Sequence, residues 1–415
     1  MTKKNPVYLT VLLVALAIVL TFQLTVIATD GYSRLFSEEE TPAADTSEDA
    51  IDPAILQKIS DIAATYAAIY PGEIDPDKIE EYLMNAFIAG AGDEHGNYIS
   101  ADDLDEYLAS VEGNFDGIGV SVLYNADIGA IEIISVFPDS PAERAGLLPG
   151  DLIIYVGRGD SRQSVAELGY YTAVGLIKGE AGTFAEFAVL RGGEEIEFSV
   201  ERAEVTDHTV SFHMYSHDDR VAVIRISQFE RVTFEQFEQA MTDAAAAGAE
   251  AYVFDMRNNP GGDLSAIVSV LDMLLPEGPI IRIEYKDSKN NTQMTSDAEC
   301  VTAPMAVLCN GNTASAGELF CAALQDYDKA TVVGTQTYGK GTMQKMFKLT
   351  DGSAISMTIA YYLPPYSENY HGAGVTPDIL CEVSDDLAGI NINKFTDDND
   401  NQLRAAVAAL GLADR

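Results

Sequence analysis

The hydrophobic pattern changes several times along the chain. Between residues 53 and 110, apolar positions recur three or four residues apart, which predicts a small helical region. Its two stripes are Ile55, Ile59, Ile62 and Tyr66, and then Ile79, Leu83, Ala86 and Phe87. Between residues 111 and 203 the pattern becomes one of short apolar runs, which predicts a strand-rich module with a helix over residues 164–177. The strand runs are Gly117–Leu123, Ile131–Phe137, Leu152–Val156 and Phe184–Leu190.

Residues 204–384 alternate strand runs with helical stretches, which is typical of an α/β core with a mixed sheet and helices. The expected strands are Val221–Ile226, Ala251–Asp255, Met305–Leu308, Thr331–Val333 and Ala354–Ile359. The expected helices are Thr233–Ala247 and Leu264–Leu275. In the last region, residues 385–415, the pattern predicts a short amphipathic helix over Asn401–Leu412.

The N-terminal segment has its own pattern. No residue from Val7 to Ile27 is charged, and the run is long enough to span a bilayer. Lys3 and Lys4 precede it, so we expect residues 1–30 to be a transmembrane anchor with the bulk of the chain outside the cytoplasm. Val26-Ile27-Ala28 also fits a cleavage site, and cleavage would give a secreted protein. Residues 31–52 are rich in acidic residues, with Ser, Thr and Pro between them. This composition predicts a flexible linker.

Charge and metal-ligating residues exclude several functions. The formal net charge of −40 argues against nucleic acid, whose binding needs basic patches. The four cysteines show no metal-type pairing, and in an exported protein disulfides between them stay open. The positions of Cys309 and Cys321, in the strand and the helix expected to flank Ser315, favour small-residue packing. His208, His213 and His217 are spaced five and four residues apart, and no carboxylate completes a known metal pattern. We therefore expect no metal and no cofactor.

Two polar segments carry the candidate chemistry. Ser315 lies among small residues between an apolar strand run and a helical stretch, and Lys340 lies between two glycines. A serine hydroxyl needs a base to become a nucleophile, and a lysine buried in apolar surroundings can be neutral enough to serve. Gln344 is four residues beyond Lys340, so the two share a face in a strand or a helix, and its neutral amide can hold the amine without keeping it charged. His371 is an alternative base, but its loop rich in Tyr, Gly and Pro favours a surface position.

The same segments offer donors for an oxyanion. A nucleophile at a strand-to-helix turn places its oxygen near the first N–H groups of the helix, so Ala316 is one expected donor. Gly261 and Gly262 follow another apolar run and would let backbone amides approach a substrate closely. We take one of these two glycines as the second donor.

These residues match a known family in order along the chain. The chain resembles the C-terminal processing peptidases, also called tail-specific proteases. Gly96 stands where that family usually has a serine, while the residues at the positions of Ser315, Lys340 and Gln344 agree with it. The other matching blocks are Gly92–Tyr98, Phe115–Val120, Ser140–Asp151, Asp255–Gly262 and Gly374–Asp378.

The resemblance implies a serine endopeptidase that cleaves proteins near their C-termini. It implies a PDZ domain over residues 111–203, inserted between the helical region (53–110) and the protease core (204–384), that binds the substrate tail and gates activity. Such domains bind a chain terminus by adding it as a strand. The residues expected to meet its carboxylate are Gly117, Ile118, Gly119 and Val120. Family members often dimerise through helical terminal regions, so we expect a homodimer.

One position departs from the family pattern, and two other functions stay open. Lys178 stands where the family usually has an arginine implicated in gating, and lysine lacks the planar bidentate fork of arginine. A catalytically silent PDZ scaffold that binds protein tails is the first alternative, although Ser315, Lys340 and Gln344 are all present. An acyl-thioester hydrolase on a related core is the second, although small acyl substrates need no tail-binding module.

Overall fold

The computed structural model describes residues 52–104, 107–108, 114–125 and 128–412, which form two compact units. One unit contains residues up to Tyr107 together with Ile283–Thr292 and Thr342–Tyr362. The other contains Leu108–Arg282, Gln293–Gly341 and Leu363–Arg415. In the part that the structure describes, no helix combines the length and apolar character that crossing a bilayer requires. The predicted anchor and nearly all of the predicted acidic linker lie outside the described residues.

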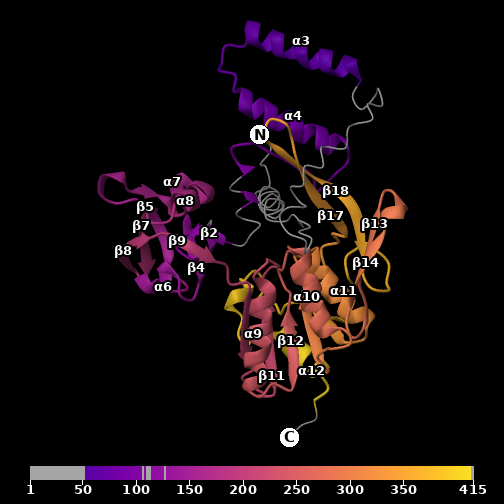
Figure 1. The fold of residues 1–415 in the computed structure, drawn as a ribbon. Helices are drawn as coiled ribbons and strands as arrows, with labels where there is room; N and C mark the ends of the chain where they lie inside the picture. Colours follow the sequence, from indigo (N-terminus) through magenta and orange to yellow (C-terminus); the bar gives the residue numbers. More distant parts are fainter. Residues whose placement is uncertain (1–51, 105–106, 109–113, 126–127, 413–415) are drawn as a thin grey trace. The chain divides into compact units, whose positions relative to one another are not determined.

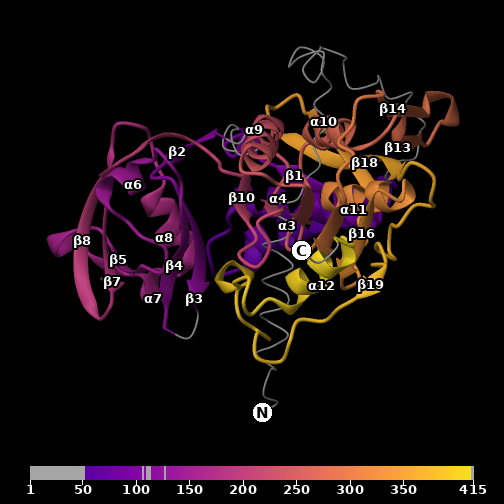
Figure 2. The same cartoon turned by 90° about the horizontal axis from the view of Figure 1, so that it is seen from below.

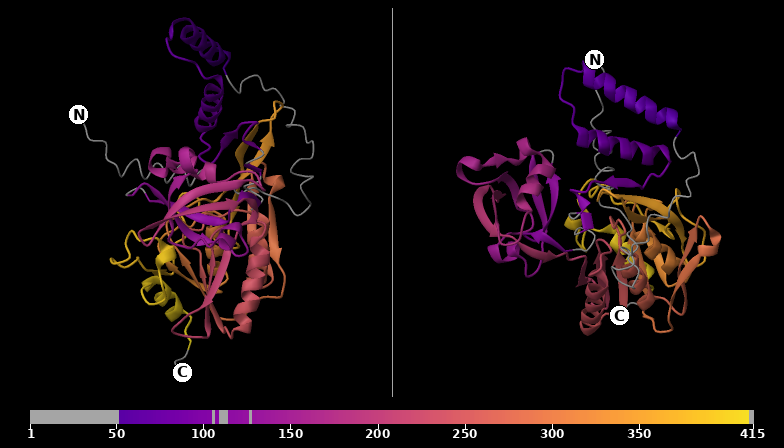
Figure 3. Two further views of the ribbon diagram at one scale, coloured as in Figure 1. Left: turned by 90° about the vertical axis from the view of Figure 1, so that its left-hand side faces the viewer. Right: turned by 45° about the horizontal axis from the view of Figure 1, so that its top comes forward.

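The first unit begins with two helices, α3 (Pro53–Ile69) and α4 (Pro76–Gly90), and Figure 3 shows them joined by a short connection. Both start where the sequence gives a strong signal, since Asp52 and Asp75 accept a hydrogen bond from the first turn and a proline follows each. Neither helix contains a buried residue. Their apolar stripes are therefore exposed within this chain.

A five-stranded sheet completes this unit, with strand order β1-β18-β13-β14 and β17 paired to β18. The strands are β1 (Asn97–Ile99), β13 (Gly278–Tyr285), β14 (Thr292–Ser296), β17 (Thr342–Lys348) and β18 (Ala354–Leu363). Strands β13 and β14 run from one unit into the other. The antiparallel ladder between β17 and β18 contains a bulge, because Met343 pairs with Ala360 but Gln344 pairs with Thr358.

The strand-rich module of the second unit holds a six-stranded sheet, β3-β4-β5-β7-β8 with β6 on β5, and a separate antiparallel pair, β2-β9 (Figure 1). Its strands are β2 (Asn114–Gly117), β3 (Val120–Asn125), β4 (Ala130–Val136), β5 (Leu152–Val156), β6 (Gln163–Ser164), β7 (Phe184–Arg191), β8 (Glu194–Glu201) and β9 (Ala203–Thr206). Its helices are α6 (Pro141–Ala145), α7 (Val165–Leu168) and α8 (Tyr170–Ile177). The helix predicted over residues 164–177 is broken, because Gly169 takes φ 76° and ψ 167°.

The predicted α/β core contains a six-stranded sheet of order β10-β11-β12-β15-β16-β19. All neighbours are parallel except β10 and β11. The strands are β10 (Val210–Met214), β11 (Val221–Ile226), β12 (Ala251–Asp255), β15 (Met305–Cys309), β16 (Ala330–Gly334) and β19 (Ile379–Leu380). The helices are α9 (Thr233–Ala246), α10 (Leu264–Leu274), α11 (Ala316–Asp326) and α12 (Asn401–Ala409). Single 3-10 turns cover Gly159–Ser161, Ser288–Asn290 and Ile392–Lys394.

Helices cover both faces of this sheet (Figure 2). Leu403 and Ala406 of α12 pack on alternate side chains of the strands, such as Val253 and Leu308. The intervening side chains face the other way, where Phe254 contacts Phe320 of α11 edge to face. Because β12 and β15 are adjacent parallel strands, the loops that follow their carboxyl ends lie at the same edge of the sheet.

Candidate active site

Ser315 occupies a sharp turn between β15 and α11. Its backbone has φ 56° and ψ −120°, a combination that residues with a side chain seldom adopt, and the residue is 1% exposed. The turn is held from both sides. The N–H of Ala314 donates to the carbonyl of Asn259, and the Tyr370 hydroxyl donates to the carbonyl of Ser315 at 3.2 Å. A strained residue over-determined in this way is typical of a functional site.

The carboxylate of Glu318 joins the serine turn to the lysine loop. Its Oε2 accepts from the N–H of Ser315 at 2.9 Å and from the N–H of Lys340 at 2.7 Å. Its Oε1 accepts from the hydroxyl of Thr337 and the N–H of Gly339, both at 2.6 Å. The structure therefore brings the main chains of the predicted nucleophile and the predicted base to one carboxylate oxygen.

Glu318 is fully buried, and this burial raises its pKa, while the four hydrogen bonds act in the opposite direction. All four partners donate, so the arrangement suits an ionised carboxylate. Our sequence reasoning did not single out Glu318. The signal was present, because serine followed three residues later by glutamate is a capping-box pattern at a helix start.

Lys340 is 2% exposed and lies in the loop that precedes β17. The flanking glycines are required by close neighbours. A Cβ on Gly339, whose φ is 97°, would lie 3.0 Å from the N of Gly374, and a Cβ on Gly341 would lie 2.5 Å from Oδ1 of Asn369. The lysine is enclosed because the chain packs directly against both of its neighbours.

His371 is exposed, as the sequence indicated. Its Nδ1 lies 3.4 Å from the N–H of Gly341, which donates to it. The same loop holds the lysine segment from two further points. The Asn369 side chain donates to the carbonyl of Gly341, and the N–H of Gly372 donates to the carbonyl of Gly339. His371 thus supports the loop that carries Lys340.

Gly261 lies directly against the serine. A Cβ on Gly261, whose φ is 103°, would lie 2.6 Å from the Cβ of Ser315 and 2.9 Å from the N of Ala316. The N–H of Gly261 itself donates to Oδ1 of Asn259 at 2.8 Å. Gly262 is equally confined, since a Cβ there would lie 1.8 Å from the carbonyl oxygen of Phe229. Gly261 and Ala316 therefore lie together at the nucleophile turn, with the Gly261 N–H already engaged, whereas Gly262 lies against Phe229.

A buried ionic network fixes the start of this glycine loop. Arg257 is 3% exposed and places its Nη2 2.8 Å from Asp255 and 2.7 Å from Asp400. Asp400 also caps α12, accepting from the N–H groups of Gln402 and Leu403. The network ties the C-terminal helix to the loop that begins after β12. A buried charge of this kind persists only where partners surround it.

Gln344 lies on β17, in the first unit. It is 1% exposed, and its Nε2 lies 3.1 Å from the hydroxyl oxygens of both Thr342 and Thr358. Its Oε1 is buried and has no hydrogen-bond partner among the residues that the structure describes. The carboxamide thus keeps an acceptor unused.

The remaining predicted residues lie elsewhere in the second unit. Gly117 ends β2 and Val120 begins β3, and the link between them consists of Ile118, which is buried, and Gly119, which has φ 80°. Lys178 ends α8 and is exposed. His213 and His217 pair with Asp397 and Asp398 at 2.9 and 3.0 Å, and the described residues contain no group of side chains arranged to hold a metal. All four cysteines are free thiols, and Cys309 and Cys321 are buried as the sequence indicated.

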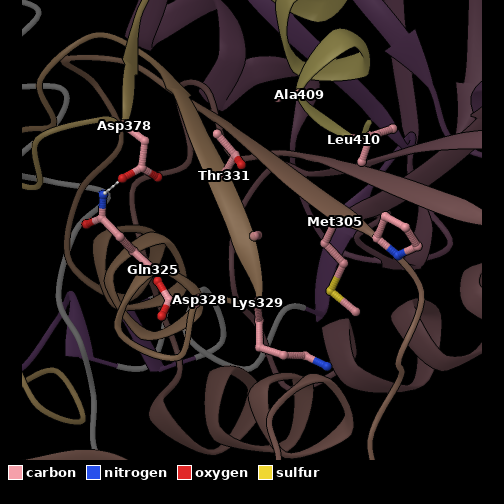
Figure 4. A pocket seen from close by; sticks show the side chains of 10 residues that line it. Met305, Gln325, Asp328, Lys329, Thr331, Asp378, Ala409 and Leu410 are labelled. Carbon is pink, nitrogen blue, oxygen red and sulfur yellow. Dashed lines mark hydrogen bonds between the residues drawn. The ribbon is translucent and has the colours of Figure 1, made fainter. Parts of the chain in front are cut away.

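A hollow of about 320 Å³ lies at the opposite end of the parallel strands (Figure 4). Met305 and Ala330 line it, and these are the first residues of β15 and β16, whereas Ser315 follows the carboxyl end of β15. Gln325 donates to Asp378 at 2.7 Å along its wall. This hollow is therefore no part of the candidate active site.

Known proteins agree with the family that these residues indicated. Residues 220–381 match peptidase family S41. The carboxyl-terminal-processing protease of Synechocystis sp. is 33% identical over 307 residues, which cover 72% of this chain and 69% of that protein. The carboxy-terminal-processing protease of Bartonella bacilliformis is 31% identical over 338 residues, which cover 79% of this chain and 75% of that protein. The carboxy-terminal processing protease CtpA of Bacillus subtilis is 29% identical over 357 residues, which cover 86% of this chain and 73% of that protein.

Among solved structures, a Bacteroides fragilis protein assigned to the S41 proteases shares the fold. The TM-score is 0.53 at 17% identity, over 83% of this chain and 94% of that one. The family match and the named relatives define the class of protein as a serine peptidase. The chain belongs to peptidase family S41, in its group of carboxy-terminal processing serine peptidases.

Proposed function

We propose that this chain is a membrane-anchored, extracytoplasmic endopeptidase that cleaves proteins near their C-termini with Ser315 as nucleophile and Lys340 as base. One observation carries the proposal. A single oxygen of Glu318 accepts from the N–H groups of both residues, at 2.9 and 2.7 Å. Two residues 25 positions apart are thereby fixed beside one another in the same unit of the structure.

The proposed reaction starts from a neutral lysine, which burial favours. Lys340 takes the proton of the Ser315 hydroxyl while Oγ attacks the carbonyl carbon of the scissile peptide bond. The N–H of Ala316 receives the oxyanion, together with that of Gly262, since the Gly261 N–H is engaged. As the C–N bond breaks, the lysine returns the proton to the leaving amine. Water then hydrolyses the acyl-enzyme by the same route, and Gln344 holds the lysine amine.

For the substrate tail we propose the strand-rich module as a PDZ domain. Strand β3 lies at the edge of its sheet, so an extended peptide can add to it. The segment Gly117–Val120 precedes that edge, and its amides are the proposed partners of the terminal carboxylate. In the proposed gating, Lys178 acts through one point charge, because lysine cannot form the bidentate contact of arginine.

We also propose a homodimer formed through the N-terminal helices. On α3 the exposed apolar residues recur at alternating steps of four and three, which is the seam of a coiled coil. They are Ile55, Ile59, Ile62, Tyr66 and Ile69, all between 37% and 76% exposed. On the membrane side, the uncharged run from Val7 to Ile27 behind Lys3 and Lys4 supports the anchor.

The test uses the full-length chain in detergent micelles with an unfolded protein that ends in small apolar residues. We expect cleavage by the parent and at least a thousandfold loss in Ser315→Ala and Lys340→Ala. Mass spectrometry of the products locates the cut and shows whether it lies near the C-terminus. Equal cleavage by Ser315→Ala would overturn the mechanism. Tail binding without cleavage by either protein would favour a silent scaffold, and hydrolysis of an acyl thioester alone would favour the thioesterase.

A further inference from the structure

The carboxamide of Gln344 is fixed by a relay of hydrogen bonds inside the first unit. The bulge in the β17–β18 ladder sets Gln344 directly opposite Thr358, and Nε2 of Gln344 lies 3.1 Å from Oγ1 of Thr358. Bulges commonly re-aim one side chain in this way. Oγ1 of Thr358 in turn donates to Oδ1 of Asp93 at 2.7 Å, and Oδ2 of Asp93 accepts from the N–H of Thr358 at 2.7 Å. The relay runs from Asp93 through Thr358 to Gln344.

The relay has a fixed polarity because of the charge on Asp93. Partial burial raises the pKa of Asp93, but the hydrogen bonds from Thr358 outweigh it, so the pKa lies below its ordinary value. The carboxylate is therefore ionised at neutral pH and can only accept. Since the Thr358 hydroxyl has one proton and gives it to Asp93, its oxygen can only accept from Gln344. The nitrogen of the carboxamide must then face Thr358.

The other contact of Gln344 agrees with this assignment. Its second N–H reaches Oγ1 of Thr342 at 3.1 Å, so both N–H groups have acceptors. Oε1 is left over, buried and without a partner among the described residues. A buried carbonyl oxygen with no donor costs roughly 1–3 kcal/mol, so such an atom needs a reason to persist.

We propose that Asp93 is a positioning residue for catalysis, which acts through Thr358 to fix the carboxamide of Gln344 with Nε2 towards Thr358 and Oε1 as its acceptor. This inference rests on the proposed function, which assigns the base to Lys340. An oxygen accepts an N–H of the amine and leaves the lone pair of nitrogen for the serine proton. A reversed carboxamide would offer an N–H to that lone pair and block it. Asp93 belongs to the block Gly92–Tyr98, to which the proposed mechanism gives no other task.

The test reverses the relay with a side chain of the same shape, and it also removes the hydrogen bond that Oδ1 of Asp93 accepts from the N–H of His95 at 3.2 Å. In Asp93→Asn the side-chain oxygen still accepts from the N–H of Thr358, while the new NH2 group donates to the Thr358 hydroxyl. That hydroxyl must then donate to Gln344, which favours Oε1 facing Thr358 and N–H facing the base. We expect kcat/KM to fall about tenfold or more while KM changes little. The ascending limb of the pH profile should move to lower pH, because an N–H beside the amine disfavours its charged form.

Further variants separate positioning from folding. Thr358→Val removes the hydroxyl at similar volume and should match the loss of Asp93→Asn, whereas Thr358→Ser keeps the hydroxyl and should keep activity. In Gln344→Ala the relay has no carboxamide to orient, so adding Asp93→Asn to this variant should lower kcat/KM by no more than about twofold. Asp103→Asn is the matched control, because Asp103 is exposed and accepts from Ser100 in the same unit.

The outcomes distinguish the relay from the mechanism beneath it. Activity that survives in Ser315→Ala would remove the proposed function, whatever Asp93 does. Loss of activity in Ser315→Ala, with Asp93→Asn and Thr358→Val both folded and fully active, would overturn the relay alone. An additive loss in the Asp93→Asn/Gln344→Ala double variant, with no shift of the pH profile, would show that Asp93 merely supports the fold.

Discussion

The strained turn at Ser315 persists because buried polar groups hold it on every side. A positive φ at a residue with a side chain costs on the order of 1–3 kcal/mol. Glu318 offsets that cost with hydrogen bonds to Ser315, Thr337, Gly339 and Lys340. One carboxylate thus stabilises the nucleophile and the base together, so strain at the serine and order in the lysine loop depend on each other.

The sequence predicted Ser315, Lys340 and Gln344 because each carries chemistry that its residue type reveals. The residue types of Glu318 and Asp93 do not by themselves reveal a role in the site, because both act by accepting hydrogen bonds from segments distant in the chain. Their roles depend on which loops meet, and that is a property of the fold. The capping-box spacing could have marked Glu318, whereas no local pattern marks a pairing between residues 93 and 358.

At Glu230 the structure predicts a pH-dependent stability. Burial, together with the nearby Asp207 carboxylate, raises the pKa of Glu230 to about 8, although the hydrogen bond that its Oε1 accepts from Gln228 acts in the opposite direction. A carboxyl group whose pKa is raised by folding binds its proton more tightly in the folded protein than in the unfolded one. The contribution of protonated Glu230 to the free energy of unfolding is present at low pH and is lost as pH rises from about 4.5 towards 8. Its upper bound is about 5 kcal/mol.

The measurement is the free energy of unfolding in urea at pH 5.5 and at pH 8. In Glu230→Gln the neutral amide imitates the protonated acid and does not ionise. The free energy of unfolding of the variant, relative to that of the parent, should therefore rise by at least about 1 kcal/mol between pH 5.5 and pH 8. Glu238→Gln, at an exposed position on α9, should follow the parent. Parallel pH curves for parent and Glu230→Gln would show that Glu230 is ionised in the folded protein.

At the scale of elements, short apolar runs predicted several strands with the bounds that the structure shows. Strands β5, β11 and β12 have the expected bounds. Strand β8 was not predicted, although Glu194–Glu201 alternates apolar and polar residues as a half-exposed strand does. Strands β13, β14 and β17 were not predicted either. Their pairing with β18 joins segments far apart in the sequence, which local patterns do not show.

The loop after β12 gives a prediction that separates backbone strain from close approach. Gly261 and Gly248 have φ values of 103° and 99°, so alanine is equally strained at both. A Cβ on Gly261 would lie 2.6 Å from the Cβ of Ser315, whereas a Cβ on Gly248 meets nothing within 4 Å. Gly261→Ala should lower kcat/KM by about a hundredfold or more by displacing the serine.

Both variants should lose about 1 kcal/mol of stability from the backbone alone, and Gly261→Ala somewhat more from the contact. Peptidase assays and urea unfolding on both proteins provide the measurement. Normal activity in Gly261→Ala would mean that the loop moves away from Ser315 at little cost. Loss of activity in Gly248→Ala would show that strain at a distance is enough.

For the whole molecule, the exposed seam on α3 and the net charge of −40 act in opposite directions on self-association. Apolar burial between two copies favours the dimer, and repulsion between two acidic chains opposes it. Light scattering on the full-length chain in detergent micelles should give a dimer. Ile62→Glu with Ile69→Glu should give a monomer, while Ala64→Glu, on the opposite face of α3, should leave the dimer intact.

Salt adds a test of what holds the two copies together. Raising the ionic strength from about 0.05 to 0.5 M screens repulsion between the acidic chains but leaves apolar burial in place. The dimer should therefore tighten with salt, the opposite of an interface that depends on ion pairs. A dimer weakened by salt would place the contact on charged surface elsewhere, and an unchanged dimer in the double glutamate variant would exclude α3 as the seam.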